Sequence, residues 1–497
     1  MARVWVESVG CKVSRADAEA LLAELLAEGH VPAPVRAEAD VVVLTTCCVT
    51  AQAERTSRQR ARRLAAGGAA VVVTGCAAVY RAEQFSGFPV VPRVAVRDTV
   101  AALSVAEGPL PGGCAGARGA LPCGTWSREK PVQAPLVRSG RPERTRAVLK
   151  IQDGCSSACT YCAVRLVRGT PWSLPVDEVL RVAEQALARG CGEIVLSGIN
   201  LGLYAGRPPQ GAGHAAGGAR TWDLAAVVEL LAGLPALQRL RLSSIEPQHL
   251  SDRLLAAMRH PRVARHLHVP LQSADDGVLA AMGRPYRYAE YLDLVAAARR
   301  SIPGLMLSTD VIVGFPGESS TAFQKTLAAI DATSGLFGRV HVFTFSPRPG
   351  TSAAELSPLP DQELRRRRRT AAAAALATRE AAARRLVGRR LEVLVEDRRG
   401  GLWRGYSSEY VRCGVRGTVR RGTITQVVAE RVRNGLVECS IAPTLAGARS
   451  SVGGTVSQTE RSGRPRSASA CEVRSVDSNG PACEAMRSVK TGRGKEG

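Results

Sequence analysis

The chain has 497 residues, a formal net charge of +23 and an isoelectric point near 10.1. This length predicts two or three domains at roughly 100–200 residues each. The charge indicates a polyanionic partner, nucleic acid before membrane, although an Arg-rich and Ala-rich composition alone also produces it. Neither a secretory signal nor an uncharged apolar run of the roughly 18–20 residues that span a membrane is present. We therefore expect a cytoplasmic protein without a membrane partner, whose fourteen cysteines serve as metal ligands, catalysts or core thiols rather than disulfides.

Residues 1–102 alternate between short β-branched runs and helical patterns, which predicts a Rossmann-like domain with a parallel sheet. The expected strands are Val4–Val6, Asp40–Thr46 and Ala70–Thr74; the expected helices are one with leucines at 21, 22, 25 and 26, and Gln52–Ala66. Cys11, Cys47 and Cys76 each stand just past one of these strands. Because ligands gather beyond the carboxyl ends of parallel strands, and thiolates select soft metals, the three cysteines predict a metal site. The alternative is three buried core thiols.

Residues 103–144 lose periodicity in a run of Gly, Pro, Ala and Arg, which predicts a linker. We interpret Cys114 and Cys123 in this linker as incidental thiols.

Residues 145–370 begin a second alternation, and the pattern of strand and helix favours a partial (β/α)6 barrel. The expected strands lie at Arg146–Gln152 and near 193–197, 239–243, 266–271, 306–313 and 339–345, with helices such as Val176–Arg189 and Tyr288–Arg300. Chemistry in such barrels belongs at the C-terminal ends of the strands, and Cys155 directly follows the first of them. The Gly-rich and Pro-rich segment Ala205–Arg220 is expected to be a surface loop on that face.

An Arg-rich helical stretch, Glu363–Arg390, connects to a short all-β region through a helix at 371–387. Strands expected at Leu391–Glu396, Tyr410–Cys413, Gly417–Arg420 and the runs up to Cys439 predict a small barrel over 388–441. Residues 442–497 are rich in Ser, Gly and Arg, and we expect this tail, with Cys471 and Cys483, to be disordered and free of ligands.

The spacing Cys155-x3-Cys159-x2-Cys162 carries the most specific chemistry. It offers three thiolates, one fewer than a closed zinc or four-iron site needs, so a metal bound here keeps an open coordination position. The alternative is a zinc knuckle with a distant fourth ligand.

The same residues resemble the radical S-adenosylmethionine enzymes, which carry this spacing with an aromatic or hydrophobic residue at the place of Tyr161. The resemblance extends to the methylthiotransferases through KIQDGC, LVRGTPWSLP, EIVLSGINLGLY, RLSSIEP, HLHVPLQS, TDVIVGFPGE and HVFTFSPRPGTSA. It covers the chain to about residue 440 and implies an N-terminal cluster domain, a radical domain and a C-terminal TRAM barrel.

Within that family, GCKV, VTAQAERTSRQ and KIQDGC look most like the branch that acts on N6-threonylcarbamoyladenosine at tRNA position 37. The isopentenyladenosine branch tends to have GCQMN, and the branch acting on a ribosomal protein aspartate tends to have GCPKN. Both remain alternatives, as does a non-catalytic zinc-dependent nucleic-acid-binding protein.

The resemblance implies two [4Fe–4S] clusters and S-adenosylmethionine as cofactors. Cys155, Cys159 and Cys162 would bind the catalytic cluster, and Cys11, Cys47 and Cys76 the auxiliary cluster, with Cys48 a conceivable substitute for Cys47. Further contacts to S-adenosylmethionine are expected at Ser197, Gly198, Glu246, Gln272, Ile312 and Gly314. The partners implied are the tRNA anticodon stem-loop, a sulfur donor and a reductant such as flavodoxin or ferredoxin.

Several residues leave two interpretations open. Arg168, Arg284 and Arg348 could bind phosphates or carboxylates, or lie on the surface. The run Arg365–Arg369 could be a solvated helix face or a contact to tRNA phosphates, and the aromatic residues Trp403, Tyr406 and Tyr410 could stack on bases or fill the small barrel. Departures from the family pattern are Thr45, Arg165, Ala274 and the run Trp172–Ser173–Leu174.

Overall fold

The computed structural model describes residues 1–105, 145–207 and 222–443. Residues 106–144 of the predicted linker, most of the predicted loop at 205–220 and residues 444–497 of the predicted tail lie outside these ranges, as do Cys114, Cys123, Cys471 and Cys483. The linker was predicted to begin at residue 103, but residues 103–105 are the last turn of a helix. Among the described residues, no helix combines the length and apolar character needed to cross a membrane.

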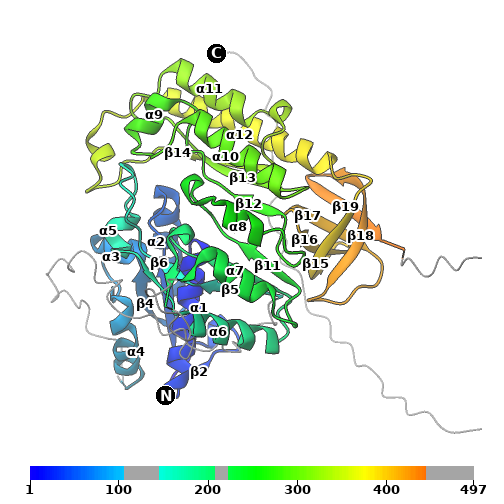
Figure 1. Ribbon diagram of the computed structural model, residues 1–497. Coiled ribbons are helices and arrows are strands. Elements are labelled where there is room, and N and C mark those ends of the chain that lie inside the picture. Colours follow the sequence, from blue (N-terminus) through cyan, green and yellow to red (C-terminus); the bar gives the residue numbers. More distant parts are fainter. Residues whose placement is uncertain (106–144, 208–221, 444–497) are drawn as a thin grey trace, which may run out of the picture. The chain divides into compact units, whose positions relative to one another are not determined.

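Residues 1–105 form a parallel sheet in the order β2-β1-β3-β4, drawn in blue in Figure 1. Its strands are β1 (Arg3–Ser8), β2 (Val31–Pro32), β3 (Val41–Thr46) and β4 (Ala70–Gly75). Its helices are α1 (Lys12–Ala27), α2 (Ala51–Ala65), α3 (Cys76–Tyr80) and α4 (Val96–Val105). The predicted parallel sheet is confirmed, and alternate residues of each strand pack on opposite faces: Val41 and Val43 against Leu21 and Leu25, and Leu44 against Leu64.

The central domain is the predicted partial barrel. Two three-stranded parallel sheets, β11-β8-β5 and β12-β13-β14, meet through single bridges such as that between Ser244 and His268. The strands are β5 (Arg146–Lys150), β8 (Glu193–Ser197), β11 (Arg239–Leu242), β12 (His266–His268), β13 (Met306–Val313) and β14 (Arg339–Thr344). β12 is shorter than the predicted 266–271, because Pro270 has no N–H to continue the ladder.

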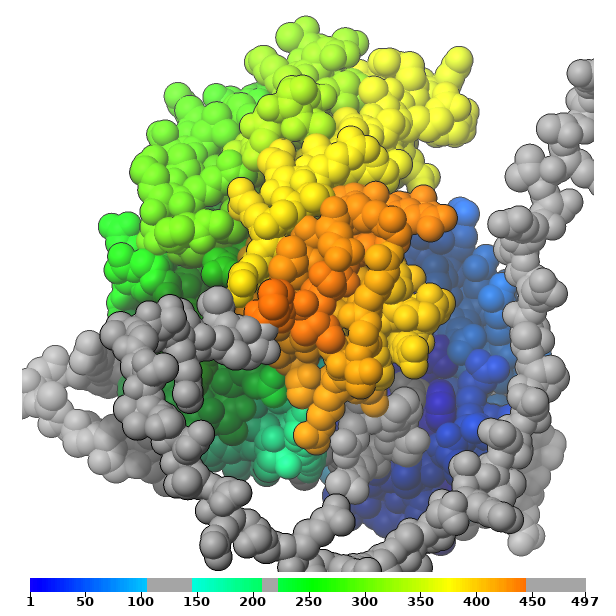
Figure 2. Space-filling model, turned by 90° about the vertical axis from the view of Figure 1, so that its right-hand side faces the viewer, coloured from blue at the N-terminus to red at the C-terminus, as the bar shows by residue number. Residues whose placement is uncertain are grey.

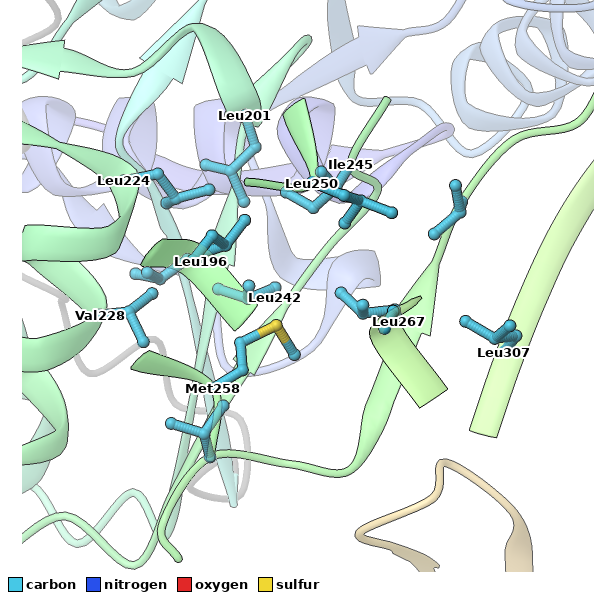
Figure 3. Close-up of a cluster of buried hydrophobic side chains, with 14 of the residues drawn as sticks. Leu196, Leu201, Leu224, Val228, Leu242, Ile245, Leu250, Met258, Leu267 and Leu307 are labelled. Carbon is cyan, nitrogen blue, oxygen red and sulfur yellow. The ribbon is translucent and has the colours of Figure 1, made fainter. Parts of the chain in front are cut away.

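Helices cover the outer side of this barrel. They are α6 (Val176–Ala188), α7 (Leu224–Ala232), α8 (Asp252–Ala257), α9 (Asp276–Ala281), α10 (Tyr288–Ser301) and α11 (Ser320–Ile330). Short elements beside the first strand are β6 (Gln152–Asp153), α5 (Val164–Arg168), β7 (Trp172–Ser173), β9 (Ala205–Gly206) and β10 (Trp222–Asp223). Leucines of successive strands, Leu196, Leu242, Leu267 and Leu307, belong to one hydrophobic cluster with helix residues such as Val228 (Figure 3).

α12 (Asp361–Arg384) leads from the partial barrel into residues 390–441, which form a closed barrel in the order β15-β16-β17-β19-β18. The strands are β15 (Arg390–Arg399), β16 (Leu402–Ser407), β17 (Arg412–Arg416), β18 (Ile424–Arg433) and β19 (Leu436–Ile441). A small C-terminal barrel is thus confirmed, but the strand predicted at Gly417–Arg420 is wrong. Gly417 has φ 102°, and this segment turns the chain toward β18. The prediction also omitted β16, which the turn at Gly400–Gly401 joins to β15.

The inner side of the barrel wall is charged. Glu193 at the start of β8 accepts hydrogen bonds from Arg239 (3.2 Å) and Arg241 (2.9 Å) of β11, and all three side chains are buried. Burial acts to raise the pKa of Glu193, but the two arginines outweigh it and lower the pKa to about 2. Arg241 also donates to the carbonyls of Ser407 and Ser408 at 3.1 Å, and Arg239 to the carbonyl of Glu392 at 2.9 Å. The same ion network therefore fixes the C-terminal barrel to the partial barrel.

We predict that Glu193→Gln lowers the free energy of unfolding by about 3–5 kcal/mol, because it leaves two buried guanidinium groups without their counter-charge. Urea unfolding followed by circular dichroism measures this change. Glu184→Gln, on the exposed side of α6, is the matched control and should change stability by less than about 0.5 kcal/mol. Equal stability of the two variants would contradict the role given to Glu193.

Candidate metal centres

The three N-terminal cysteines lie at the carboxyl edge of the blue sheet, as the pattern predicts. Cys11 is the N-cap of α1, and its sulfur accepts a hydrogen bond from the Ser14 N–H at 3.5 Å. Cys47 follows β3, and Cys76 follows β4 as the first residue of α3. Helix N-termini and their N–H groups stabilise negative charge, so both helix starts favour the thiolate that a soft metal needs.

Four thiols gather here rather than three. The thiol of Cys47 hydrogen-bonds that of Cys11, which lowers the pKa of Cys11 to about 6 and raises the pKa of Cys47. The thiol of Cys48 is likewise hydrogen-bonded to Cys76 and lowers the pKa of the Cys76 thiol. Gly10 permits this packing, since a Cβ at that position would lie 2.6 Å from the Cβ of Cys47. Cys48 therefore remains an alternative ligand to Cys47.

The second triplet occupies the loop between β6 and α5. The sulfur of Cys155 accepts from the Ser157 N–H at 3.4 Å and lies 3.9 Å from the amide nitrogen of Asn200. The Cys159 sulfur accepts from the Arg284 guanidinium at 3.2 Å. Burial raises the pKa of Cys162 to about 11, so this thiol needs a bound metal to lose its proton at neutral pH.

Arg168 links the two triplets. Its buried guanidinium donates to the sulfur of Cys76 at 3.1 Å and to Asp153 at 2.9 Å, and it pairs with Asp17 of α1 at 2.8 Å. Asp153 precedes Cys155 by two residues, and the Cys155 N–H donates to the carbonyl of Gly169, the residue after Arg168, at 3.1 Å. A single side chain thus holds both cysteine loops in place.

Asp17 and Asp153 are buried, and Lys150 pairs with both. Burial acts to raise the pKa of Asp17, but the charges of Arg168 and Lys150 outweigh it and keep the pKa below its usual range. The sequence carries no signal for this network, since Asp17 lies within an ordinary amphipathic helix and is brought to Asp153 by the fold alone. The sequence also did not identify Asn200 as a neighbour of Cys155. It lies in the family motif EIVLSGINLGLY, and nothing in that motif indicates which side chain faces the cysteine loop.

The donor sets fit iron–sulfur clusters. Each offers cysteine sulfurs with hydrogen bonds from backbone N–H or guanidinium groups, and such bonds stabilise thiolates and tune cluster potentials. A cubane bound by three cysteines keeps one iron without a protein ligand.

Of the residues expected to contact S-adenosylmethionine, one is linked to the second triplet and another has a buried, unpaired amide oxygen among the described residues. Glu246, which follows β11, forms an ion pair with Arg284, whose other amino group reaches Cys159. Gln272, beyond β12, has a positive φ of 67° and a buried amide oxygen without a partner in the described chain. Strain and an unpaired acceptor at a strand end are typical of a binding position.

The other four expected contacts stand at strand ends in more ordinary surroundings. Ser197 is the buried last residue of β8, and a Cβ on Gly198 would lie 2.8 Å from the Gln152 side-chain oxygen. Ile312 is half-buried in β13. Gly314, with φ 74°, lies against Leu364 of α12, so helix packing alone accounts for a glycine there.

The three arginines with open interpretations are buried and bind carboxylates of the chain itself. Arg168 and Arg284 are described above; Arg348 donates to Glu54 of α2 at 2.6 Å. The interpretation of these residues as exposed surface is therefore wrong. In the run Arg365–Arg369, Arg367 is buried against Glu318 and the other four are exposed.

The aromatic residues of the small barrel divide between core and interface. Trp403 packs at the edge of the barrel core. Tyr406 and Tyr410 stack at 5.0 Å between ring centres and face the partial barrel, where Arg146 and Arg241 lie over their rings.

None of the departures from the family pattern replaces a cysteine of the two triplets. Thr45 donates to the Glu7 carbonyl, Arg165 is exposed, and the Ala274 N–H donates to Thr326. The run Trp172–Ser173–Leu174 includes β7, which pairs with β6.

The two segments of the chain that carry the cysteine triplets each match a known protein family. Residues 149–330 match the Radical SAM superfamily, and residues 3–94 match Uncharacterized protein family UPF0004. The threonylcarbamoyladenosine tRNA methylthiotransferase of Thermotoga maritima is 31% identical over 83% of this chain and 91% of its own length. A probable enzyme of the same name from Pyrococcus horikoshii is 31% identical over 80% of this chain and 89% of its own length. The tRNA-2-methylthio-N(6)-dimethylallyladenosine synthase of Paracoccus denitrificans is 31% identical over 71% of this chain and 77% of its own length.

The chain belongs to the radical SAM methylthiotransferase family. This methylthiotransferase is an enzyme that acts on tRNA and uses S-adenosylmethionine and [4Fe–4S] clusters. The zinc-binding, non-catalytic alternative is thereby excluded. The two kinds of relative have similar identity, so the comparisons leave the modified nucleoside open.

We predict that Arg168→Met lowers both iron content and stability, because it leaves two buried carboxylates with Lys150 as their single cationic partner among the described residues and removes a donor from Cys76. Anaerobically purified protein should contain about half the iron and sulfide of wild type, a loss confined to the cluster held by Cys76. Arg168→Lys should restore part of the lost iron and sulfide. Arg165→Met, on an exposed residue of the same helix, is the control, and an equal iron content in Arg165→Met and Arg168→Met would count against the link.

Proposed function

We propose that this methylthiotransferase converts N6-threonylcarbamoyladenosine at position 37 of tRNA into its 2-methylthio derivative. Cys155, Cys159 and Cys162 would bind the cluster that S-adenosylmethionine joins, and Cys11, Cys47 and Cys76 would bind the auxiliary cluster. Together these groups supply, when bound, a carbon-centred radical that removes a hydrogen from the adenine ring and a methylated sulfur that takes its place. We also propose a cytoplasmic location, a flavodoxin or ferredoxin as reductant, and a separate sulfur donor.

The chain's own residues arrange these groups. Arg168 holds the two cysteine loops against each other, so the adenine carbon that reacts would lie where both clusters reach it. Arg284 and Glu246 would orient S-adenosylmethionine from the second loop.

The polar interior of the partial barrel is the observation that supports threonylcarbamoyl over dimethylallyl. His268 and Asp310 lie 3.1 Å apart, with His341 beside them, and Ser308 joins His268 to His266. An apolar dimethylallyl group would remove water from these polar groups and offer them no further hydrogen bonds. The carboxylate, hydroxyl and urea of a threonylcarbamoyl group would form hydrogen bonds with them in place of water.

Lys12 adds a positive charge at this interior. Its ammonium lies 5.7 Å from the ring centre of Tyr410, and it acts electrostatically on the imidazoles of His266 and His341. In the described chain it has no carboxylate partner, and burial lowers its pKa. The threonine carboxylate of the substrate would supply that partner.

We expect tRNA from a strain lacking this gene to lose the 2-methylthio form of threonylcarbamoyladenosine, measured by mass spectrometry of nucleosides. Expression of the wild-type chain should restore it. Loss of the 2-methylthio dimethylallyl nucleoside instead would contradict the proposed substrate, and loss of a methylthiolated ribosomal protein would contradict both.

Lys12→Gln should raise KM for a threonylcarbamoylated anticodon stem-loop at least tenfold with less effect on kcat, because it removes the counter-charge of the carboxylate. Lys12→Arg should retain most of the affinity. Arg15→Gln, one turn along α1 and exposed, is the control. A KM unchanged by Lys12→Gln would remove this residue from substrate recognition.

The two triplets should differ in what their loss abolishes. Replacing Cys155, Cys159 and Cys162 by Ala should stop formation of 5′-deoxyadenosine, whereas replacing Cys11, Cys47 and Cys76 should preserve it and stop methylthiolation. Chromatographic quantification of 5′-deoxyadenosine and of the RNA product in one assay separates the two effects. The division of roles would be wrong if both triple variants lost 5′-deoxyadenosine equally.

A further inference from the structure

Three side chains that neither cysteine triplet uses converge inside the partial barrel. They are His268 of β12, Asp310 of β13 and His341 of β14, and one nitrogen or oxygen atom of each lies within 4.8 Å of the other two. The closest pair is the Nε2 of His268 and the Oδ2 of Asp310, at 3.1 Å. The imidazoles of His268 and His341 meet edge to face, with 5.7 Å between their ring centres. We call these three residues the interior site.

The register of the sheet, rather than a loop, brings the three residues together. His268 is paired with Ser308 across β12 and β13, and Asp310 is paired with His341 across β13 and β14. Ser308 and Asp310 are two residues apart in β13, so all four side chains lie on one face of the sheet. Because three hydrogen-bonded strands fix these positions, a ligand bound there needs little rearrangement of the backbone.

That face is the inner face of the barrel. Val340 and Val342, on either side of His341, pack in the hydrophobic cluster that includes Ala371 and Ala375 of α12. Figure 2 shows α12 in yellow on the outside of the molecule, next to the C-terminal barrel in orange. Since neighbouring residues of a strand point to opposite faces, the imidazole of His341 points into the barrel. All three residues of the interior site are half-buried.

The chemistry of the interior site fits a divalent metal ion. Among the described residues, no lysine or arginine forms an ion pair with Asp310, whose carboxylate has His268 as its partner. Burial lowers the pKa of His341 to about 4, so its imidazole is neutral near pH 7 and keeps a lone pair for a metal. Two imidazoles and one carboxylate form zinc sites with an open fourth position. Donor atoms about 2.0–2.2 Å from zinc lie roughly 3.3–3.6 Å apart in a tetrahedron, close to the separations found here.

The hydroxyl of Ser308 is placed to orient one of these ligands. It lies 2.9 Å from the Nδ1 of His268 and 2.9 Å from the Nε2 of His266. A histidine that binds metal through Nε2 usually donates its Nδ1–H to a neighbouring oxygen, which fixes the ring and its tautomer. Ser308 can accept that hydrogen bond and donate its own proton to His266. The Nε2 of His268 then carries a lone pair beside the carboxylate of Asp310.

We propose that the interior site binds one zinc ion through the Nε2 of His268, a carboxylate oxygen of Asp310 and a ring nitrogen of His341. Three protein ligands leave one position for water or an anionic oxygen. Lys12 and Arg339 act electrostatically on His341, and their positive charge favours an anion at this fourth position. The carboxylate of a threonylcarbamoyl group would be such an anion. That extension rests on the proposed function, whereas binding of the metal does not.

The test measures zinc bound to the full-length, anaerobically reconstituted enzyme in the absence of RNA. The enzyme is incubated with zinc chloride, separated from loosely bound metal by gel filtration, and analysed for zinc and iron by inductively coupled plasma mass spectrometry. Asp310→Asn and His341→Asn each remove one ligand with little change of size. The control, His260→Asn, removes an exposed histidine between α8 and β12. Thermal unfolding and iron content show whether the variants are folded and carry their clusters.

We expect the wild-type enzyme and His260→Asn to retain about one more zinc per chain than either ligand variant. Zinc K-edge absorption of the wild-type enzyme should show nitrogen and oxygen neighbours at about 2.0–2.2 Å. Sulfur neighbours at about 2.3 Å would place the zinc in a cysteine triplet and overturn the proposal. Equal zinc retention in the wild-type enzyme and Asp310→Asn would overturn it as well.

The absorption spectrum requires only the wild-type chain, so it decides between the interior site and the cysteines even where a variant unfolds. Because no RNA is present, the result is independent of the proposed substrate.

Discussion

The guanidinium of Arg168 is the contact on which the arrangement of this enzyme depends. It joins a carboxylate of the first helix, a carboxylate beside the second cysteine loop and the sulfur of Cys76. A buried arginine of this kind is expensive to desolvate and is tolerated because two carboxylates surround it. Its position between the triplets means that neither cysteine loop can shift without breaking a buried ion pair. The same contacts therefore join the two domains and set the spacing of the two candidate clusters.

The wall of the partial barrel also contains buried charged groups that are paired with one another. Outward residues are leucines that pack beneath the helices, while inward residues are arginines, histidines and carboxylates that bind one another. Because strand side chains alternate, one short strand serves both purposes. The polar interior is compatible with a charged substrate, and the ion network at Glu193 fixes the C-terminal barrel where its tyrosines meet the wall.

Local patterns were sufficient to predict the elements that carry strong periodicity. β8 and β13 have the predicted bounds, since β-branched runs bounded by turn residues leave little choice of register. Cysteine spacing located the second triplet, because its three residues lie in one loop. Predictions were poorer where the deciding contact is distant in sequence. Asp17 and Arg348 acquire partners from other domains, and Gly417–Arg420 has the composition of a strand but turns the chain.

We propose that the two cysteine triplets hold two clusters side by side, joined through Arg168. Electron paramagnetic resonance of the reduced, anaerobically reconstituted enzyme tests it most directly, because two nearby paramagnetic clusters broaden each other's signals. We expect a dipolar interaction that disappears when either triplet is replaced and weakens in Arg168→Met. Two clusters with independent, unbroadened spectra in the wild-type enzyme would contradict it.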